Sequence, residues 1–141
     1  MRTRAVLIAL LAFIGMVDAL FLSIKRNAGP IPCHITRGCN DVLTSRYSAL
    51  AGIPISWFGL VFYVTVFSLA VFTIFETGQP AGNRLKWVFY VSGLALIISA
   101  LLVGIQAFTL NAFCEYCLLS AALVLTIFLL SPHSSRRTHP R

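Results

Sequence analysis

The chain of 141 residues is 58% hydrophobic and only 11% charged, and its mean hydropathy is +0.88. This composition excludes an ordinary water-soluble domain and indicates an integral membrane protein. The formal net charge of +7 is explained by membrane topology together with tail residues. Because the sequence contains no nucleic-acid-binding motif, we expect no nucleic acid among its partners.

Four apolar stretches each have about the 20 residues that are needed to cross the hydrocarbon core of a bilayer. They cover residues 5–24, 57–75, 87–110 and 114–130. The rest of the chain is too short for a second folded domain, so any soluble partner domain would be a separate protein. The sequence therefore predicts a single integral membrane domain over residues 1–141, an all-α bundle of four transmembrane helices.

The first stretch comes after two arginines and could be mistaken for a signal peptide. Its apolar run continues to Ile24 before it meets Lys25, which is the length of a span rather than of a cleaved leader. Asp18 lies inside this span. A carboxylate at the centre of a span costs roughly 2.5 to 3.5 kcal/mol, so we expect Asp18 to face the bundle or a wet cavity. It could serve there as a hydrogen-bonding group between helices or as a group near a reactive site.

Residues 25–56 form the longest segment between predicted spans, and they carry Cys33 and Cys39. Prolines before Cys33 favour an extended, exposed approach, and a glycine before Cys39 gives the backbone freedom. We therefore expect a mobile loop that bears two thiols.

A short helix is predicted at the end of this loop. Asn40 can cap a helix that runs through Ala51, and Gly52 would stop it. Such a helix is too short to span the bilayer, so we expect it to lie at the interface as a lid over the bundle.

The second and third spans each begin with a tryptophan, a residue suited to the boundary between water and lipid. A short polar turn over residues 76–84 separates them. Toward the far end of the third span, Gln106 and Asn111 would lie at the same level as the lid and the start of the fourth span.

The fourth span carries a C-x-x-C motif, Cys114 and Cys117, at its beginning. Asn111 is a plausible N-cap, which would place both sulfurs on the first turn of the helix. The positive end of a helix dipole favours thiolate over thiol. The motif therefore predicts a redox pair at a membrane surface.

The basic residues predict the orientation of the bundle. Under the positive-inside rule, the side with the denser basic segments should be the cytoplasm, so we expect both termini inside and all four cysteines at the outer face. Seven basic residues fall on the first side and four on the second: Arg2, Arg4, Arg84, Lys86, Arg136, Arg137 and Arg141 against Lys25, Arg26, Arg37 and Arg46.

Three kinds of cysteine chemistry are compatible with two pairs at one membrane face. Structural disulfides would brace the outer loop, although a C-x-x-C on one helical turn is strained as a structural crosslink. A four-thiolate zinc site has the right ligand count, but the loop spacing is loose and the setting is oxidising, so we expect no metal. A thiol–disulfide relay from a soluble protein to a lipid-soluble acceptor fits the placement best.

Several runs of residues resemble the vitamin K epoxide reductase family, especially its bacterial branch without a fused thioredoxin-like domain. The resemblance covers nearly the whole chain, and its most specific feature is the loop pair combined with a late C-x-x-C. The runs are D-A-L-F-L-S at residues 18–23, C-H-I-T-R-G-C-N-D-V-L-T-S-R-Y at 33–47, G-I-P-I-S-W-F-G-L-V-F-Y at 52–63 and C-E-Y-C-L-L-S-A at 114–121.

The resemblance implies a bundle around a quinone of the ubiquinone or menaquinone type. It further implies that Cys33 forms a mixed disulfide with a separate, extracytoplasmic thioredoxin-fold protein of the DsbA-like kind, and that Cys39 resolves it. Reduced Cys39 would then attack the membrane pair at Cys114. Cys117 would remain as the thiolate that delivers electrons to the quinone.

The resemblance also implies candidate quinone contacts. Ser45 matches a family serine that would support the loop or the quinone edge. Aromatic walls near the ring would come from Phe58, Phe62 and Tyr63, and Asp18 is a further candidate contact.

Two departures from the animal enzymes narrow the expected substrate. Those enzymes place an asparagine and a tyrosine as hydrogen-bond donors to vitamin K, whereas this chain has Ile55 and Ala121 at the matching positions. We therefore expect quinone reduction coupled to disulfide formation, in a bacterial inner membrane. Reduction of vitamin K epoxide or of quinone proper, and a non-catalytic four-span protein with structural disulfides, remain alternatives. The DsbB type of quinone-coupled protein carries its C-x-x-C earlier in the chain.

Overall fold

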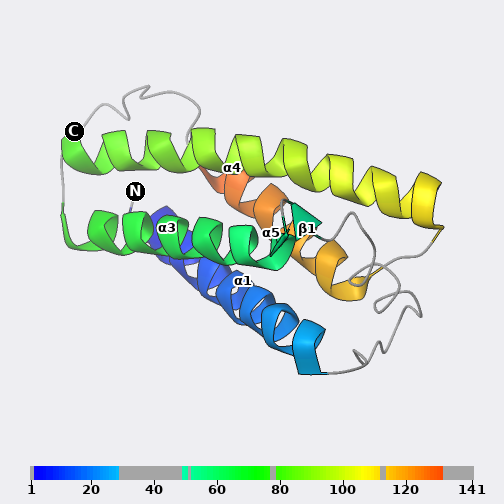
Figure 1. Ribbon diagram of the computed structural model, residues 1–141. Helices are drawn as coiled ribbons and strands as arrows, with labels where there is room; N and C mark the ends of the chain where they lie inside the picture. The colour runs from blue at the N-terminus through cyan, green and yellow to red at the C-terminus, as the bar shows by residue number, and fades with distance from the viewer. Residues whose placement is uncertain (1, 29–48, 51, 77–78, 112–113, 132–141) are drawn as a thin grey trace.

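The structure is a computed structural model that describes residues 2–28, 49–50, 52–76, 79–111 and 114–131. Long helices dominate it (Figure 1), which confirms the predicted all-α membrane bundle. The elements are α1 (Arg2–Ala28), β1 (Ala49–Leu50), β2 (Ile53–Pro54), α3 (Ile55–Phe75), α4 (Gln79–Ile105), the π-helix η2 (Gln106–Leu110) and α5 (Glu115–Leu130).

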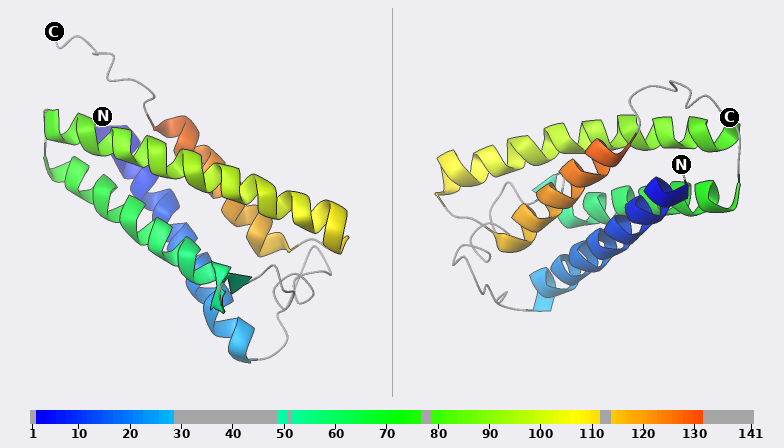
Figure 2. Two further views of the ribbon diagram at one scale, coloured as in Figure 1. Left: turned by 45° about the horizontal axis from the view of Figure 1, so that its top comes forward. Right: turned by 180° about the vertical axis from the view of Figure 1, so that it is seen from behind.

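The helices run alternately up and down the bundle (Figures 1 and 2). The end of α1, the β1–β2 hairpin, η2 and the start of α5 all lie toward one end. The start of α1 and the end of α5 lie toward the other. Helix α1 packs mainly against α3 and also against α5, while α4 packs against α3 and α5. This arrangement brings the end of the first helix, α1, and the start of the last described helix, α5, to the same end of the bundle.

Three helical stretches are long and apolar enough to cross a membrane: Thr3–Lys25, Ile55–Phe75 and Asn83–Thr109. Helix α5 is also apolar but has only 16 residues. At about 1.5 Å per residue it is about 24 Å long, whereas the hydrocarbon core is about 30 Å thick. The fourth predicted span, residues 114–130, therefore corresponds to the shortest of the four α-helices in the described part of the chain.

The outer surface of the bundle is apolar, as expected for helices that are surrounded by lipid. Large hydrophobic side chains point outward from every long helix, for example Leu10, Val61, Leu101 and Leu129.

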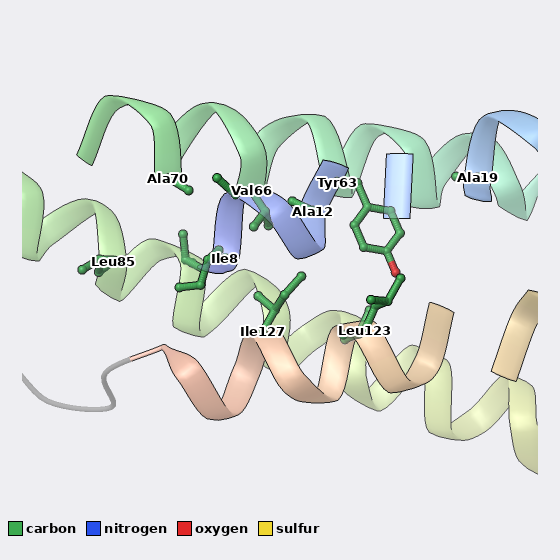
Figure 3. Packing of buried hydrophobic residues seen from close by; sticks show 12 residues of the cluster. Ile8, Ala12, Ala19, Tyr63, Val66, Ala70, Leu85, Leu123 and Ile127 are labelled. Atoms are coloured by element: carbon green, nitrogen blue, oxygen red, sulfur yellow. The ribbon is translucent and has the colours of Figure 1, made fainter. Parts of the chain in front are cut away.

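Small and branched side chains fill the space between the helices (Figure 3). The core brings together Ile8, Ala12 and Ala19 of α1, Tyr63, Val66 and Ala70 of α3, Leu85 and Val88 of α4, and Leu123, Val124 and Ile127 of α5. Because the alanines leave little side chain between α1 and α3, these two helices approach closely. The same packing mode is common between helices in membranes.

Tyr63 is the largest fully buried side chain of this core. Its ring lies against Gly15 of α1, where even a Cβ atom would overlap the ring carbons. Its hydroxyl reaches α5, where it is 2.7 Å from Ser120 Oγ and donates a 3.1 Å hydrogen bond to the Ser120 carbonyl. Tyr63 thus connects α1, α3 and α5 across the bundle.

The predicted lid helix is wrong at its C-terminal end. Ala49 and Leu50 form strand β1, which pairs antiparallel with Ile53 and Pro54 of β2. Gly52 adopts φ +83° in the turn between them, a left-handed conformation that glycine accepts readily. The glycine therefore reverses the chain here instead of stopping a helix. The rest of the predicted lid, residues 40–48, lies outside the described residues.

Candidate redox site at the start of α5

Cys114 and Cys117 lie together where α5 begins. Cys114 is the N-cap residue, and its carbonyl accepts a 3.0 Å hydrogen bond from the Leu118 N–H. Cys117 follows in the first turn, and the side chains of the two cysteines are hydrogen-bonded to one another. Both are free thiols in this structure. The predicted placement of a dithiol at a helix start therefore agrees with the geometry.

The two sulfurs differ in their access to the surroundings. Cys114 is fully buried, whereas Cys117 is only half-buried. Cys117 is accordingly the better placed of the two to meet a molecule that approaches the bundle from outside.

Asn111 is not the N-cap of this helix, contrary to the sequence prediction. It adopts a left-handed conformation, φ 50° and ψ 32°, and it ends η2, with its N–H donating to the Gln106 carbonyl. Asparagine tolerates this conformation better than most residues, because its short polar side chain can bond locally. Helix α5 therefore starts at Glu115, and Cys114 takes the capping position.

Gln106 contacts both halves of the cysteine pair. Its side chain is almost fully buried, at 3% exposure, and its Oε1 accepts a 3.1 Å hydrogen bond from the Cys114 N–H. The same side chain also lies close enough to the Cys117 thiol to interact with it. The sequence predicts Gln106 at the level of the pair but predicts no contact. The contact could have been predicted from the presence of an amide side chain within an apolar span, because such a side chain usually hydrogen-bonds to a neighbouring helix.

Asp18 of α1 faces the interior of the bundle, where it is 7% exposed. Its carboxyl group is close enough to interact electrostatically with Cys114, Cys117 and Tyr63. The structure thus places the Asp18 carboxyl inside the bundle, within electrostatic range of the C-x-x-C motif.

The three predicted aromatic walls lie in different settings. Phe62 packs edge-on against Tyr63, with ring centroids 5.0 Å apart. Tyr63 is part of the buried core, so it does not form an open wall. Phe58 is 47% exposed on the outer side of α3. Because Tyr63 contacts Ser120, three residues after Cys117, α3 passes within about one helical turn of the pair.

Contacts between α1 and its neighbours close the site on one side. The Phe21 ring lies 5.2 Å from the ring of Tyr116, the residue that precedes Cys117. Lys25 extends its ammonium group over the Phe21 ring, 5.9 Å from the ring centroid. Ser23 also donates a 3.0 Å hydrogen bond to Ser56 of α3. These contacts hold the end of α1 against the starts of α3 and α5.

Cys33, Cys39 and Ser45 lie outside the described residues. Their predicted roles therefore stay predictions. Within the described part of the chain, no group of three or more His, Cys, Asp and Glu side chains could hold a metal ion.

The fold and the site together define an all-α membrane bundle with a dithiol at the start of its last helix. The sequence matches the vitamin K epoxide reductase family over residues 6–131, and the chain belongs to this family. It is also 33% identical over 123 residues to the thiol-disulfide oxidoreductase LTO1 of Arabidopsis thaliana. That match covers 82% of this chain but only 32% of the plant protein, so the chain spans about a third of its relative's length.

Proposed function

We propose that this protein is a membrane thiol–disulfide oxidoreductase that passes electrons from a thioredoxin-fold dithiol protein to a quinone. The observation that carries the proposal is the Cys114–Cys117 dithiol, which is held at a helix start inside an apolar bundle. Family membership and the activity named for the plant relative support the thiol–disulfide chemistry.

The electron path needs two disulfide exchanges and one reduction of an acceptor. A reduced partner would attack a Cys33–Cys39 disulfide at Cys33 and release Cys39 as a thiolate. The partner's second thiol would then attack the mixed disulfide, which leaves the partner oxidised and both loop cysteines reduced. Cys39 would next attack a Cys114–Cys117 disulfide at Cys114 and release Cys117 as a thiolate. Loss of two electrons and two protons from the reduced membrane pair then restores its disulfide.

A quinone is the acceptor class that suits this site. A quinone takes up two electrons and two protons to become a hydroquinone, and it dissolves in the bilayer that surrounds the bundle. The residues present are compatible with such a ring, because Cys117 is half-buried while the exposed Phe58 offers an aromatic surface on α3. Ser45 and Phe62 remain proposed contacts to the quinone. Asp18 and Tyr63 are buried, so they would act on the quinone from the interior of the bundle.

The proposed setting is a bacterial inner membrane with both termini in the cytoplasm. The active site would then face the outer compartment, where disulfides persist. A separate DsbA-like protein would be the electron donor, and the net result would be disulfide formation in that compartment.

The test is turnover of the purified protein with a soluble quinone analogue and a reduced thioredoxin-fold dithiol. We expect quinone reduction that is lost in Cys117→Ala, because no second sulfur is then available to close the membrane disulfide. We also expect the free Cys33 thiol of Cys39→Ala to form a mixed disulfide when this variant is mixed with the oxidised partner, because Cys33 can then attack the partner's disulfide.

A protein with purely structural disulfides would give the opposite outcome. Its single Cys→Ala variants would lose roughly 2 to 5 kcal/mol of stability, and electron flow would be absent in wild type and variants alike. Reduction of vitamin K epoxide in the same assay would instead favour the alternative substrate.

A further inference from the structure

Buried apolar packing holds only the second half of α5. The residues of α5 that belong to the buried core are Leu123, Val124 and Ile127. None of residues 115–122, all of which the structure describes, is buried, and this first half carries Cys117. Contacts between apolar surfaces have no preferred direction. The rotation at which the first half of α5 faces its neighbours therefore depends on more specific contacts.

Hydrogen bonds hold this first half at both of its ends. At the start, the backbone N–H of Cys114 bonds the side chain of Gln106. One turn after Cys117, Ser120 meets the hydroxyl group of Tyr63. This second contact joins α5 to α3, whereas the main neighbours of α5 are α4 and α1. It is thus a specific link across the bundle, close to the redox pair.

Tyr63 and Ser120 are joined by two hydrogen bonds. The single hydroxyl proton of Tyr63 is donated to the Ser120 carbonyl over 3.1 Å, so the Ser120 hydroxyl is the donor in the 2.7 Å contact between the side-chain oxygens. The Tyr63 ring has little room to follow a displaced partner, because it is 1% exposed and lies against Gly15. A tightly packed side chain that reaches from α3 toward α5 (Figure 3) therefore fixes the position of Ser120.

Ser120 and Cys117 are neighbours on the surface of α5, because residues three apart lie on the same face of an α-helix. A rotation of the first half of α5 would move both side chains together. The bonds to Ser120 therefore also determine how far Cys117 turns toward the surroundings. In the structure, Cys117 is half-buried while Cys114 is fully buried.

We propose that Tyr63 is a positioning residue of the redox pair: its two hydrogen bonds to Ser120 hold α5 at the rotation that leaves Cys117 accessible and Cys114 buried. The inference rests on the proposed function for its biological meaning, because Cys117 is there the sulfur that meets the acceptor. Its physical content is the difference in access between the two thiols, which is measurable without a partner or a quinone.

The experiment compares the two thiols of the reduced pair toward one uncharged reagent. The full chain with Cys33→Ala and Cys39→Ala is reduced in detergent and labelled briefly with N-ethylmaleimide. Tandem mass spectrometry locates the label and gives the ratio of the rate at Cys117 to the rate at Cys114. This ratio should exceed one before any further substitution, because Cys114 is fully buried. The midpoint of thermal unfolding is measured on the same samples.

Tyr63→Phe keeps the ring beside Gly15 and removes both hydrogen bonds to Ser120. We expect the rate ratio to fall by about fivefold, which is the effect of losing hydrogen bonding of ordinary strength. Ser120→Ala keeps the carbonyl as an acceptor and loses only the hydroxyl, so the ratio should fall less, by about twofold. The double variant should match Tyr63→Phe, because the Ser120 hydroxyl then has no bond to Tyr63 left to lose.

The matched control is Ser92→Ala in α4. Ser92 is fully buried, and its hydroxyl donates within its own helix, at 2.6 Å to the carbonyl of Val88. This variant removes a buried hydroxyl without removing a link between helices. The rate ratio should therefore keep its original value even where the unfolding midpoint falls.

An unchanged ratio in Tyr63→Phe would overturn the proposal even beside a lower unfolding midpoint, because the hydroxyl would then only stabilise the bundle. An equal fall in Ser92→Ala would overturn it as well, since any loosening of the core would then be sufficient. If Tyr63→Phe does not fold, the ratio in Ser120→Ala decides in the same way. Failure of the proposed electron path would leave this result unaffected, because neither a partner nor a quinone takes part.

Discussion

At the scale of single residues, close contacts rather than hydropathy decide how the helices meet. Gly15 is the clearest case, because the Tyr63 ring occupies the space where any larger side chain would begin. A hydropathy profile treats Gly15 as one more apolar position in the first span. Its importance comes from a residue 48 positions later in the chain, which is why sequence reasoning could not assign it.

Gly15→Ala should destabilise the bundle by about 1 to 3 kcal/mol, because the Tyr63 ring must move and core atoms cannot be compressed. Thermal unfolding in detergent, followed by circular dichroism, would show a lower midpoint. Gly104→Ala is the control, since nothing lies within 4 Å of its Cβ position, and this variant should keep the wild-type midpoint or raise it. An unchanged midpoint in Gly15→Ala would contradict the packing described for Tyr63.

Residue-level prediction succeeds where a side chain has one dominant role. The polar character of Asp18 inside a span predicts that it faces the bundle, and it does. Asn111 is different, because asparagine favours the N-cap of a helix and also tolerates the left-handed conformation that ends one. Here the second preference determines the structure, so the predicted N-cap is wrong.

At the scale of elements, the length of α5 sets the depth of the redox pair. A helix of about 24 Å cannot reach both surfaces of a core about 30 Å thick. If its C-terminal end lies at one surface, its first turn lies some ångströms below the other. The dithiol then belongs to the lipid phase rather than to the water layer.

This depth predicts a difference between thiol reagents. In nanodiscs, where both faces are open to solution, Cys117 of a Cys33→Ala, Cys39→Ala variant should react with uncharged N-ethylmaleimide. For each reagent, the rate at Cys117 is divided by its rate at an exposed reference thiol. This ratio should be at least about tenfold lower for a charged trimethylammonium methanethiosulfonate than for N-ethylmaleimide, because a cation does not enter the hydrocarbon readily.

The reference for this comparison is Asn83→Cys in a chain without the other cysteines. Asn83 is exposed near the start of α4, at the end of the bundle opposite the redox pair. Equal reagent ratios for Cys117 and for this reference thiol would show that the pair lies in water.

Element boundaries are predictable where apolar length alone defines them. The spans predicted at 5–24 and 57–75 fall inside α1 and α3, and the span at 87–110 covers most of α4 together with η2. The lid helix fails at Ala49 and Leu50 because Gly52 supports a tight reversal as well as a helix stop. Local sequence cannot distinguish these uses of glycine.

At the scale of the whole molecule, the up-and-down course of the helices separates two chemically different ends. One end carries the end of α1, η2 and the start of α5, while the other carries the end of α3 and the start of α4. There, Arg84 forms an ion pair with Glu76 and lies over the Phe72 ring, 5.5 Å from its centroid. The four-helix arrangement is predictable from hydropathy, but the convergence of α1, η2 and α5 at one end is a tertiary property.

The arrangement predicts that the beginning of α1 and the end of α5 share one side of the membrane, and the basic residues predict that this side is the cytoplasm. Alkaline phosphatase fused after Ser131 should therefore be inactive, and green fluorescent protein fused at the same point should fluoresce. Phosphatase fused after Ala28 is the control and should be active. An active phosphatase after Ser131 would contradict the proposed orientation.

The π-helix η2 has a consequence for tolerance to insertions and deletions. Its wide turn accommodates one more residue than an α-helix before the chain reverses at Asn111. Removing any residue between Gln106 and Asn111 would return the segment to ordinary α-helical spacing and rotate the start of α5 by about 100°. Cys114 would then leave its amide partner, so this short stretch should vary in composition far more freely than in length.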